Sequence, residues 1–343
     1  MSFILGVDTG GTYTDAVIVE DEERVISFSK SLTTHSDLSL GIGSAIQKAI
    51  GQKNIEPEKI SLVSLSTTLA TNALVEGQGD RVALVMIGFK ESDLEKHSIF
   101  DALKGDPFLV LSGGHNYAGL EKSPLDKNDL ENWISEVKGA SAYAVCSQFA
   151  VRNPEHELEA AKIIRKLTDK PVSLSHQLSA KLNGPKRALT AVLNARLIAL
   201  IDLLIIKAEH VIKDLGIQAP LMVVRGDGAL ISAAQAREKP IETILSGPAA
   251  SIVGARWLTD ESEAIVSDIG GTTTDIAVLK GGKPTIDPRG ASVGPYRTMV
   301  EAVAMYTFGL GGDSEVNLKQ EGLGGNIFLG PKRVIPVSLA ASI

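Results

Sequence analysis

The chain has 343 residues, a net charge of -7, and 44% hydrophobic and 22% charged residues, as expected for a globular protein of about two domains. Lysine and arginine are scattered, so we expect no nucleic-acid binding through a basic face. The N-terminus lacks a charged signal region, and we expect no apolar run of membrane-spanning length, which predicts a cytoplasmic protein without a membrane partner.

Strands and helices alternate along the sequence. Apolar or β-branched runs predict strands at residues 3–8, 15–20, 62–66, 82–87, 140–149, 171–175, 221–224 and 264–268. Helices are predicted at 38–50, from 153–154 onward, at 185–215 and at 247–258, and the segment 91–128 is expected to be irregular. Asp37 is a predicted N-cap and Gly216 a predicted helix end. The alternation indicates an α/β fold with mostly parallel strands and a domain boundary near residues 183 and 184.

Cysteine and histidine give no sign of a metal or redox centre. The single cysteine, Cys146, lies in an apolar run and is expected to be a buried core thiol. The six histidines stand far apart and form no short-spaced pair, so a zinc site is not expected.

A turn rich in glycine and hydroxyl residues follows the first strand. The stretch reads Asp8-Thr9-Gly10-Gly11-Thr12-Tyr13-Thr14-Asp15, and a second apolar strand follows it. Glycines bring backbone N–H groups close to a ligand, hydroxyls donate hydrogen bonds, and carboxylates bind hard cations. One such turn is consistent with either a tight hairpin or a phosphate site.

The same pattern recurs 260 residues later. Residues 268–275 read Asp-Ile-Gly-Gly-Thr-Thr-Thr-Asp, so both stretches fit D-x-G-G-T-x-T-D, and both lie between apolar strands. Two copies predict two related half-molecules, each presenting one anion-binding turn. Asp8 and Asp268 end strands and are expected to face one cleft, where Mg²⁺ would relieve their repulsion from a polyphosphate. A third glycine turn, residues 308–314, is expected to pass close to a nucleoside.

These phrases resemble those of the hydantoinase/oxoprolinase family, within the actin, Hsp70 and sugar kinase superfamily. The matching phrases are GVDTGGTYTDAV, STTLATNAL (66–74), RGDGALISAAQA (225–236), ETILSGPAASIVGA (242–255) and DIGGTTTDIA (268–277). The resemblance implies two related actin-like (ribonuclease H-like) ATPase domains, residues 1–183 and 184–343, with a nucleotide cleft between them. Family A-type subunits are commonly longer, so the C-terminal part that closes over the nucleoside is expected to be missing.

The resemblance also implies roles for individual residues. Asp8 and Asp268 would be the catalytic carboxylates that position Mg²⁺, mainly through water. The phosphates of ATP would bind Thr9, Gly10, Gly11, Thr12, Thr14, Gly270, Gly271, Thr272 and Thr273. The nucleoside would lie near Gly311, Gly312 and Asp313. Arg225 and Asp227 follow a strand, where ligand-facing residues often lie, and are candidate substrate contacts.

Neighbouring residues carry weaker signals. Asp15 and Asp275 are interpreted either as supports of the metal site or as residues that cap strands. Ser246 precedes a helix and marks either an anion site or a plain helix start. Thr67, Thr68, Thr71 and Asn72 are candidates for lining the cleft.

The resemblance implies ATP-dependent opening of a cyclic amide such as a hydantoin or 5-oxoproline, by phosphorylation of its carbonyl oxygen. A small-molecule substrate, a hydantoinase B-type partner subunit and a homo- or hetero-oligomer are expected with it. Three alternatives stay open. They are a subunit of an ATP-dependent ketone carboxylase, a small-molecule kinase, and a nucleotide-dependent switch with little chemistry of its own.

Overall fold

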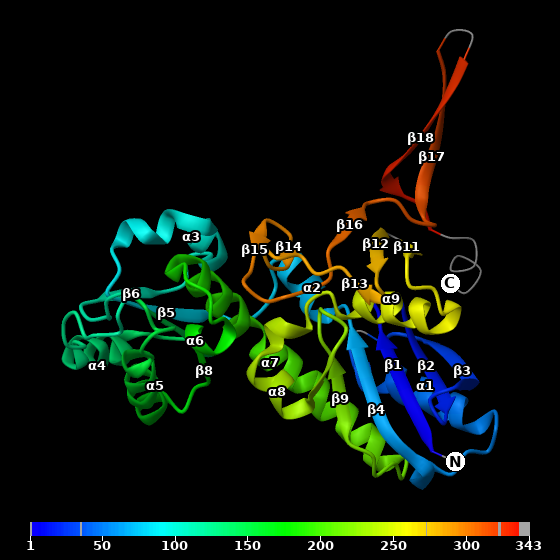
Figure 1. Cartoon of the computed structure of the whole chain (residues 1–343), viewed down its shortest axis with the longest axis horizontal. Coiled ribbons are helices and arrows are strands. Elements are labelled where there is room, and N and C mark those ends of the chain that lie inside the picture. The colour runs from blue at the N-terminus through cyan, green and yellow to red at the C-terminus, as the bar shows by residue number, and fades with distance from the viewer. Residues whose placement is uncertain (1, 35, 272, 322–323, 336–343) are drawn as a thin grey trace.

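A computed structural model describes residues 2–34, 36–271, 273–321 and 324–335. Figure 1 shows two α/β bodies joined by the long helix α7, a smaller third sheet beside the first body, and a hairpin that projects away from the rest. The observed architecture is α/β, as the alternating pattern predicts.

The first sheet contains the N-terminus and has the order β10-β9-β4-β1-β2-β3. Its strands are β1 (Phe3–Thr9), β2 (Tyr13–Glu20), β3 (Arg24–Leu32), β4 (Ile60–Thr67), β9 (Leu221–Val224) and β10 (Leu230–Ser232). Strand β4 runs parallel to β1 and β9, and the other pairs are antiparallel. Because β9 and β10 follow residue 184, the predicted division at residues 183 and 184 separates strands of one sheet.

Helix α1 (Leu38–Gly51) covers one face of this sheet and is fixed by its cap and by serines of β3. Asp37 accepts a hydrogen bond from the Ser39 amide at 3.2 Å, which confirms the predicted N-cap. Ser27 and Ser29 are buried and each donates a 2.5 Å hydrogen bond to a helix carbonyl, at Ala49 and Ala45. Strand β3 therefore turns polar side chains toward the core.

The second sheet is fully parallel and has the order β6-β5-β7-β8. It consists of β5 (Val82–Ile87), β6 (Phe108–Leu111), β7 (Ala142–Ser147) and β8 (Val172–Leu174). Its helices are α3 (Ile99–Leu103), α4 (Lys127–Glu136), α5 (Glu155–Thr168) and α6 (Ser175–Leu178), with the 3₁₀ segment η2 (Glu91–Ser98) before α3. The expectation that residues 91–128 are irregular was wrong, since η2, α3 and β6 lie there.

Helix α7 (Gly184–Asp214) packs on β5, β7 and β8 of the second sheet and on α1 of the first body, and so joins the two bodies. This helix is long and apolar enough to span a membrane, with a mean hydropathy of 2.1 over an 18-residue window. The prediction that the sequence has no apolar run of that length was therefore wrong. Two thirds of that window, 67%, is buried inside the fold, which fits a core helix. Gly216 has φ +78°, and its N–H bonds the carbonyl of Lys213, so the predicted helix end is confirmed.

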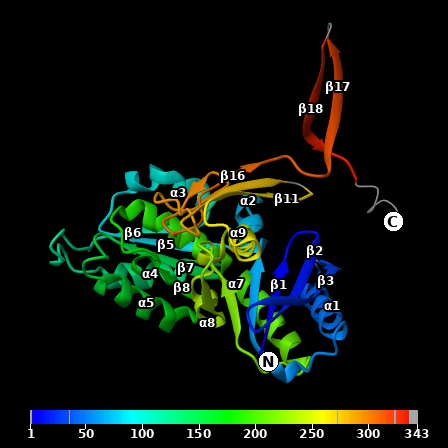
Figure 2. The ribbon, with the colours of Figure 1, turned by 45° about the vertical axis from the view of Figure 1, so that its right-hand side comes forward.

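The third sheet carries the second copy of the turn motif. It is formed by β11 (Ala264–Ile269), β12 (Thr274–Lys280), β13 (Lys283–Pro284) and β16 (Met305–Phe308). One face packs on helix α9 (Ser246–Thr259), which lies between this sheet and the first one (Figure 2). The other face presents exposed apolar side chains, namely Ile265, Ile269, Val278, Tyr306 and Phe308.

The remaining described elements are short or peripheral. They are η1 (Pro57–Lys59), α2 (Leu69–Val75), α8 (Ala233–Glu238), η3 (Pro240–Thr243), β14 (Ser292–Val293), β15 (Tyr296–Arg297), β17 (Ser314–Glu321) and β18 (Gly324–Arg333). Strands β17 and β18 pair with each other and form the projecting hairpin (Figure 1).

Candidate functional site

The two matching sequences fold into the same antiparallel hairpin. Asp8 pairs with Asp15 in the register of β1 and β2, and Asp268 pairs with Asp275 in the register of β11 and β12. The first glycine of each turn donates its N–H to the residue three positions later, at 3.0 Å for Gly10 and 2.9 Å for Gly270. The repeated sequence therefore produces a repeated backbone.

Hydrogen bonds from the hydroxyls of neighbouring residues hold the first turn in place. Ser66 of β4 donates a 2.6 Å hydrogen bond to Asp8 Oδ1, because parallel pairing sets these two residues side by side. Thr33 donates its hydroxyl to the Gly10 carbonyl at 3.0 Å and lies 3.0 Å from the buried Thr14 hydroxyl. Thr9 is also buried, so the motif hydroxyls Thr9 and Thr14 are enclosed by protein.

The second turn is tied to the third glycine turn. Backbone N–H groups of Gly312 and Asp313 donate to the carbonyls of Gly270 and Gly271, at 3.0 and 2.9 Å. Asp313 Oδ1 is buried and has no hydrogen-bond partner among the described residues. The structure thus brings together the predicted phosphate and nucleoside turns, and Gly311 and Thr273 lie in the same two turns. Thr272 lies outside the described residues.

Helix α9 connects the two turns. The Ser246 hydroxyl donates to the Thr67 carbonyl at 2.9 Å and accepts from its N–H at 3.2 Å. The Leu245 N–H donates to the Thr71 hydroxyl at 3.0 Å. These bonds place Gly247 beside Asp8, since a Cβ on Gly247 would lie 3.8 Å from Asp8 Oδ1. Ser246 is therefore engaged in docking the helix.

Carboxylates gather where the two turns meet. Burial raises the pKa of Asp8, the Ser66 hydrogen bond opposes this, and the charges of Asp15 and Asp268 raise the pKa further. Burial and the charge of Asp268 likewise raise the pKa of Asp275, against the 2.5 Å hydrogen bond from Thr307. Asp268 thus lies close enough for its charge to raise the pKa of both Asp8 and Asp275. A bound cation would relieve the repulsion among these carboxylates.

A divalent cation fits this cluster as a partner of phosphate oxygens and water. Among the described residues, no group of three or more His, Cys, Asp or Glu side chains is arranged to hold a metal on its own. Mg²⁺ commonly takes only one or two carboxylates and completes its shell with water and phosphate. Asp8 and Asp268 supply that number.

The raised pKa of Asp8 leads to a prediction about the thermal stability of the ligand-free chain. The folded chain holds the Asp8 proton more tightly than the unfolded chain, so the ionised carboxylate costs stability above its folded pKa. We expect Asp8→Asn to raise the melting temperature of the ligand-free chain at pH 7. The gain should shrink as the pH falls toward 3.8, the ordinary value. A melting temperature lowered at pH 7 would contradict this, and Asp260→Asn, at the exposed end of α9, is the control.

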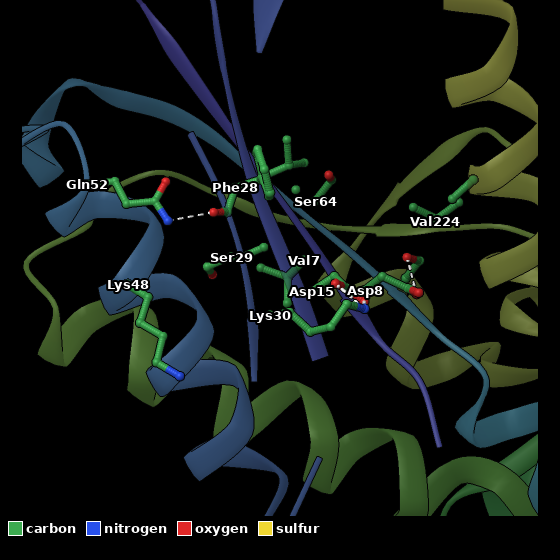
Figure 3. A pocket seen from close by; sticks show the side chains of 15 residues that line it. Val7, Asp8, Asp15, Phe28, Ser29, Lys30, Lys48, Gln52, Ser64 and Val224 are labelled. Carbon is green, nitrogen blue, oxygen red and sulfur yellow. Dashed lines mark hydrogen bonds and ion pairs between the residues drawn. The ribbon is translucent and has the colours of Figure 1, made fainter. Parts of the chain in front are cut away.

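A cavity of about 800 Å³ opens along the first sheet from Asp8 and Asp15. Figure 3 shows Asp8, Asp15 and Lys30 at one end of it and Lys48 and Gln52 on the helix beyond. Lys30 Nζ lies 2.6 Å from Asp15 Oδ1. Lys30 therefore neutralises Asp15, which leaves Asp8 as the unpaired carboxylate of this turn.

A second cavity, of about 500 Å³, adjoins the other turn. Thr307, which bonds Asp275, lines it together with Thr71 of α2. Two arginines, Arg289 of the loop before β14 and Arg297 of β15, also line it, and both donate to Asp287, at 3.0 and 2.9 Å. This cavity reaches the carboxylate cluster through Thr307 and offers polar and apolar walls to a small molecule.

The candidate substrate residues of the sequence lie in a tight turn after β9. Arg225 Nη2 donates to Asp227 Oδ2 at 2.7 Å, so the two side chains bond each other. Between them, Gly226 is closely packed, since a Cβ there would lie 2.2 Å from the Ile244 carbonyl oxygen. Neither Arg225 nor Asp227 lines the described cavities, and their role in substrate binding stays a prediction.

Several residues of the site were not predicted from the sequence. Ser66 could have been found by aligning the two predicted strands in parallel, because that register places Ser66 of β4 beside Asp8 of β1. Thr33, Thr307 and Gly247 reach the turns only through long-range packing. Asn72, which was predicted, lies 3.9 Å from the position of a Cβ on Gly11, at the first turn.

Two family models match the chain along most of its length. The model described as the hydantoinase/oxoprolinase N-terminal region matches residues 4–168, and the model described as hydantoinase/oxoprolinase matches residues 187–333. The chain belongs to the hydantoinase/oxoprolinase family. The resemblance seen in its sequence is thereby confirmed.

Named relatives within the hydantoinase/oxoprolinase family differ in their reactions. The chain is 28% identical to the caprolactamase subunit alpha of Pseudomonas jessenii, over 93% of this chain and 49% of that one. It is 25% identical to the acetophenone carboxylase gamma subunit of Aromatoleum aromaticum (96% and 49%) and 28% identical to 5-oxoprolinase 1 of Arabidopsis thaliana (80% and 25%). The chain thus spans about half or less of the curated relatives it matches.

Solved structures of the family share this fold. The ATP-dependent caprolactamase from Pseudomonas jessenii matches with a TM-score of 0.79 at 26% identity, covering 96% of this chain and 51% of that one. Nucleotide-free acetone carboxylase matches with a TM-score of 0.80 at 20% identity and the same coverage. The predicted α/β fold class is therefore confirmed.

Proposed function

We propose that this chain is the ATP-binding part of an enzyme that activates a cyclic amide by phosphorylating its carbonyl oxygen. The observation that carries the proposal is the pair of identical turns, whose aspartates Asp8 and Asp268 are close enough for the charge of one to raise the pKa of the other. Relatives named caprolactamase and 5-oxoprolinase support a cyclic amide as substrate.

The proposed roles follow from the arrangement of the turns. Asp8 and Asp268 hold Mg²⁺, while backbone N–H groups of both turns and the hydroxyl of the exposed Thr12 bind the phosphates. The predicted phosphate contacts of the Thr9 and Thr14 hydroxyls are not kept, because protein encloses both. The unpartnered Asp313 Oδ1 accepts a hydrogen bond from the nucleoside. When bound, Mg-ATP supplies the phosphoryl group that passes to the amide oxygen and leaves ADP. The protein acts mainly by positioning and charge neutralisation.

We place the substrate in the cavity lined by Thr71 and Thr307, where it lies next to the second turn. Arg289 and Arg297 carry two positive charges there against the single negative charge of Asp287. The surplus positive charge favours an anionic cyclic amide such as 5-oxoproline over a neutral lactam.

A substitution in this cavity tests the placement. We expect Arg289→Leu to raise the 5-oxoproline concentration needed for half-maximal ADP release about tenfold and to leave the requirement for ε-caprolactam unchanged. Arg256→Leu on α9, which removes a half-buried arginine paired with the exposed Asp260, is the control. Equal effects of Arg289→Leu on both substrates would contradict the charge argument.

Substrate-stimulated ADP release tests the function itself. The full chain would be assayed with Mg-ATP and, in turn, 5-oxoproline, ε-caprolactam, hydantoin, and acetophenone with bicarbonate. A rise with a cyclic amide and without bicarbonate is the expected result. A rise only with the ketone would assign the chain to the carboxylases, a candidate that the acetophenone carboxylase relative supports. A stable phosphate ester would indicate a kinase, and binding without stimulated turnover a switch.

Relatives named as alpha and gamma subunits support assembly with other chains. We propose a hydantoinase B-type subunit as the partner that completes ring hydrolysis, in a cytoplasmic enzyme. The exposed apolar face of the third sheet is a surface on which such an assembly would bury area. Ring-opened product that forms only when the partner is added would support this arrangement.

A further inference from the structure

The second sheet has a cavity of its own, which the proposed function does not use. It measures about 380 Å³ and lies where the carboxyl ends of β5 and β7 meet the first turn of α7. Its lining consists of Phe89, Asp93, Lys96, Gln148, Phe149, Leu182, Asn183, Gly184, Pro185 and Arg187. A volume near 300 Å³ or above is enough for a small ligand.

The topology of the sheet makes this position a binding crevice. From β5 the chain passes through α3 to β6 on one side, and from β7 it passes through α5 to β8 on the other. The side chains of α3 belong to the core shared with α7, whereas those of α5 pack on the opposite face. The connections thus diverge between β5 and β7, the point where open α/β sheets bind ligands.

A buried positive charge lines this crevice. The guanidinium of Arg187 is 1% exposed, and its three hydrogen bonds go to neutral oxygens. The acceptors are Ser147 O at 3.0 Å, Ser175 Oγ at 3.2 Å and Lys181 O at 3.4 Å. These use three of the five guanidinium donors, and the Cys146 thiol lies within hydrogen-bond reach of the same group. Among the described residues no carboxylate forms a direct ion pair with Arg187, and the ion pair of Glu157 is with His176. Buried charges are usually paired, so this one points to an anion.

The nearest buried carboxylate, Glu157, is already occupied. Its oxygens accept hydrogen bonds from the Ser147 amide at 2.8 Å, the Ser175 hydroxyl at 2.5 Å, and both the amide and the ring of His176. Glu157 therefore meets Arg187 only indirectly, through the shared Ser175 hydroxyl and the Ser147 backbone. Near the cavity entrance, Asp93 and Lys96 bond each other at 2.6 Å and cancel in charge.

We propose that this crevice binds a small carboxylic acid with an apolar body. The carboxylate accepts a charge-assisted hydrogen bond from a remaining N–H of the Arg187 guanidinium. The side-chain amide of Gln148 is the neighbouring donor, since that of Asn183 already bonds His97 and the Lys186 amide. The rings of Phe89 and Phe149 cover the apolar part. The site is separate from the two aspartate turns and does not depend on the reaction proposed for them.

Calorimetry on the full chain without nucleotide tests this site. Phenylacetate is the probe, phenylacetamide is its neutral match, and inorganic phosphate is the anion without an apolar body. We expect phenylacetate to bind at least tenfold more tightly than either. Similar affinity for phenylacetate and phenylacetamide, or no binding of phenylacetate, would overturn the proposal. Mg-ATP binding is titrated separately, so its failure would concern only the proposed function.

Charge changes in the lining locate the binding to this crevice without removing Arg187, whose loss would disturb the fold. Gln148→Glu adds a negative charge to the lining that Arg187 shares and should weaken phenylacetate binding at least tenfold. Asp93→Asn removes a negative charge and should strengthen binding about threefold. Asp260→Asn on α9 is the matched control and should change nothing. Unchanged affinity in both crevice variants would place the probe elsewhere and overturn the assignment.

Discussion

Mg-ATP is expected to lose at least tenfold in affinity, about 1.4 kcal/mol, when either Asp8→Asn or Asp268→Asn is introduced. Each substitution removes one of the two charges that hold the metal, while the first keeps an oxygen to accept the Ser66 hydrogen bond. Titration of Mg-ATP into the chain by calorimetry measures the loss.

The design separates a binding defect from a folding defect. Asp8→Asn is expected to stabilise the ligand-free chain, so weaker nucleotide binding cannot come from unfolding. Asp260→Asn, at the far end of α9, removes an exposed charge and should bind Mg-ATP like the wild type. Retained affinity in both cleft variants would refute the role of the paired turns.

The second large effect concerns stability and lies in the joint between α7 and the second sheet. Arg196 is buried and donates to the carbonyls of Asp80, Ala102 and Leu103 and to the Asp106 carboxylate, at 2.9, 2.9, 2.7 and 2.6 Å. Arg196→Met leaves Asp106 and these carbonyls without that donor. We expect a loss of about 3–5 kcal/mol in the free energy of unfolding.

Urea denaturation followed by circular dichroism measures this loss. The control is Arg237→Met, whose partners Asp202 and Glu209 are 43% and 44% exposed, and which should cost roughly 0–1 kcal/mol. A cost for Arg196→Met no larger than that of Arg237→Met would contradict the role of the buried cluster.

Local patterns predicted the elements that rely on local physics. The long helix was predicted at 185–215 and runs from Gly184 to Asp214, since its proline start and glycine end are encoded beside it. The two turns were predicted as hairpins and have matching registers, because their glycines and flanking apolar strands specify a hairpin directly.

Other elements could not be predicted because their signals were short or inverted. Strand β6 and helix α3, of four and five residues, were missed because each is too short to show a period and lies among the glycines and prolines of residues 91–128. Strand β3 was missed since Ser27, Ser29 and Ser31 face the core, where an apolar alternation would normally stand. The cavity beside Arg289 forms from α2, a distant loop and β16, and no sequence spacing reports such an assembly.

Helix α9 also limits how the two halves of the cleft can move. Its start is fixed to Thr67 of the first sheet, and near its end the Trp257 indole donates to the Glu22 carbonyl of the β2–β3 turn at 3.1 Å. The third sheet packs on the other side of the same helix. With α9 anchored at both ends, the third sheet can approach Asp8 only by sliding across the helix. Such a shear step, on the order of 1–2 Å, would close the aspartates on a ligand without bending either hairpin.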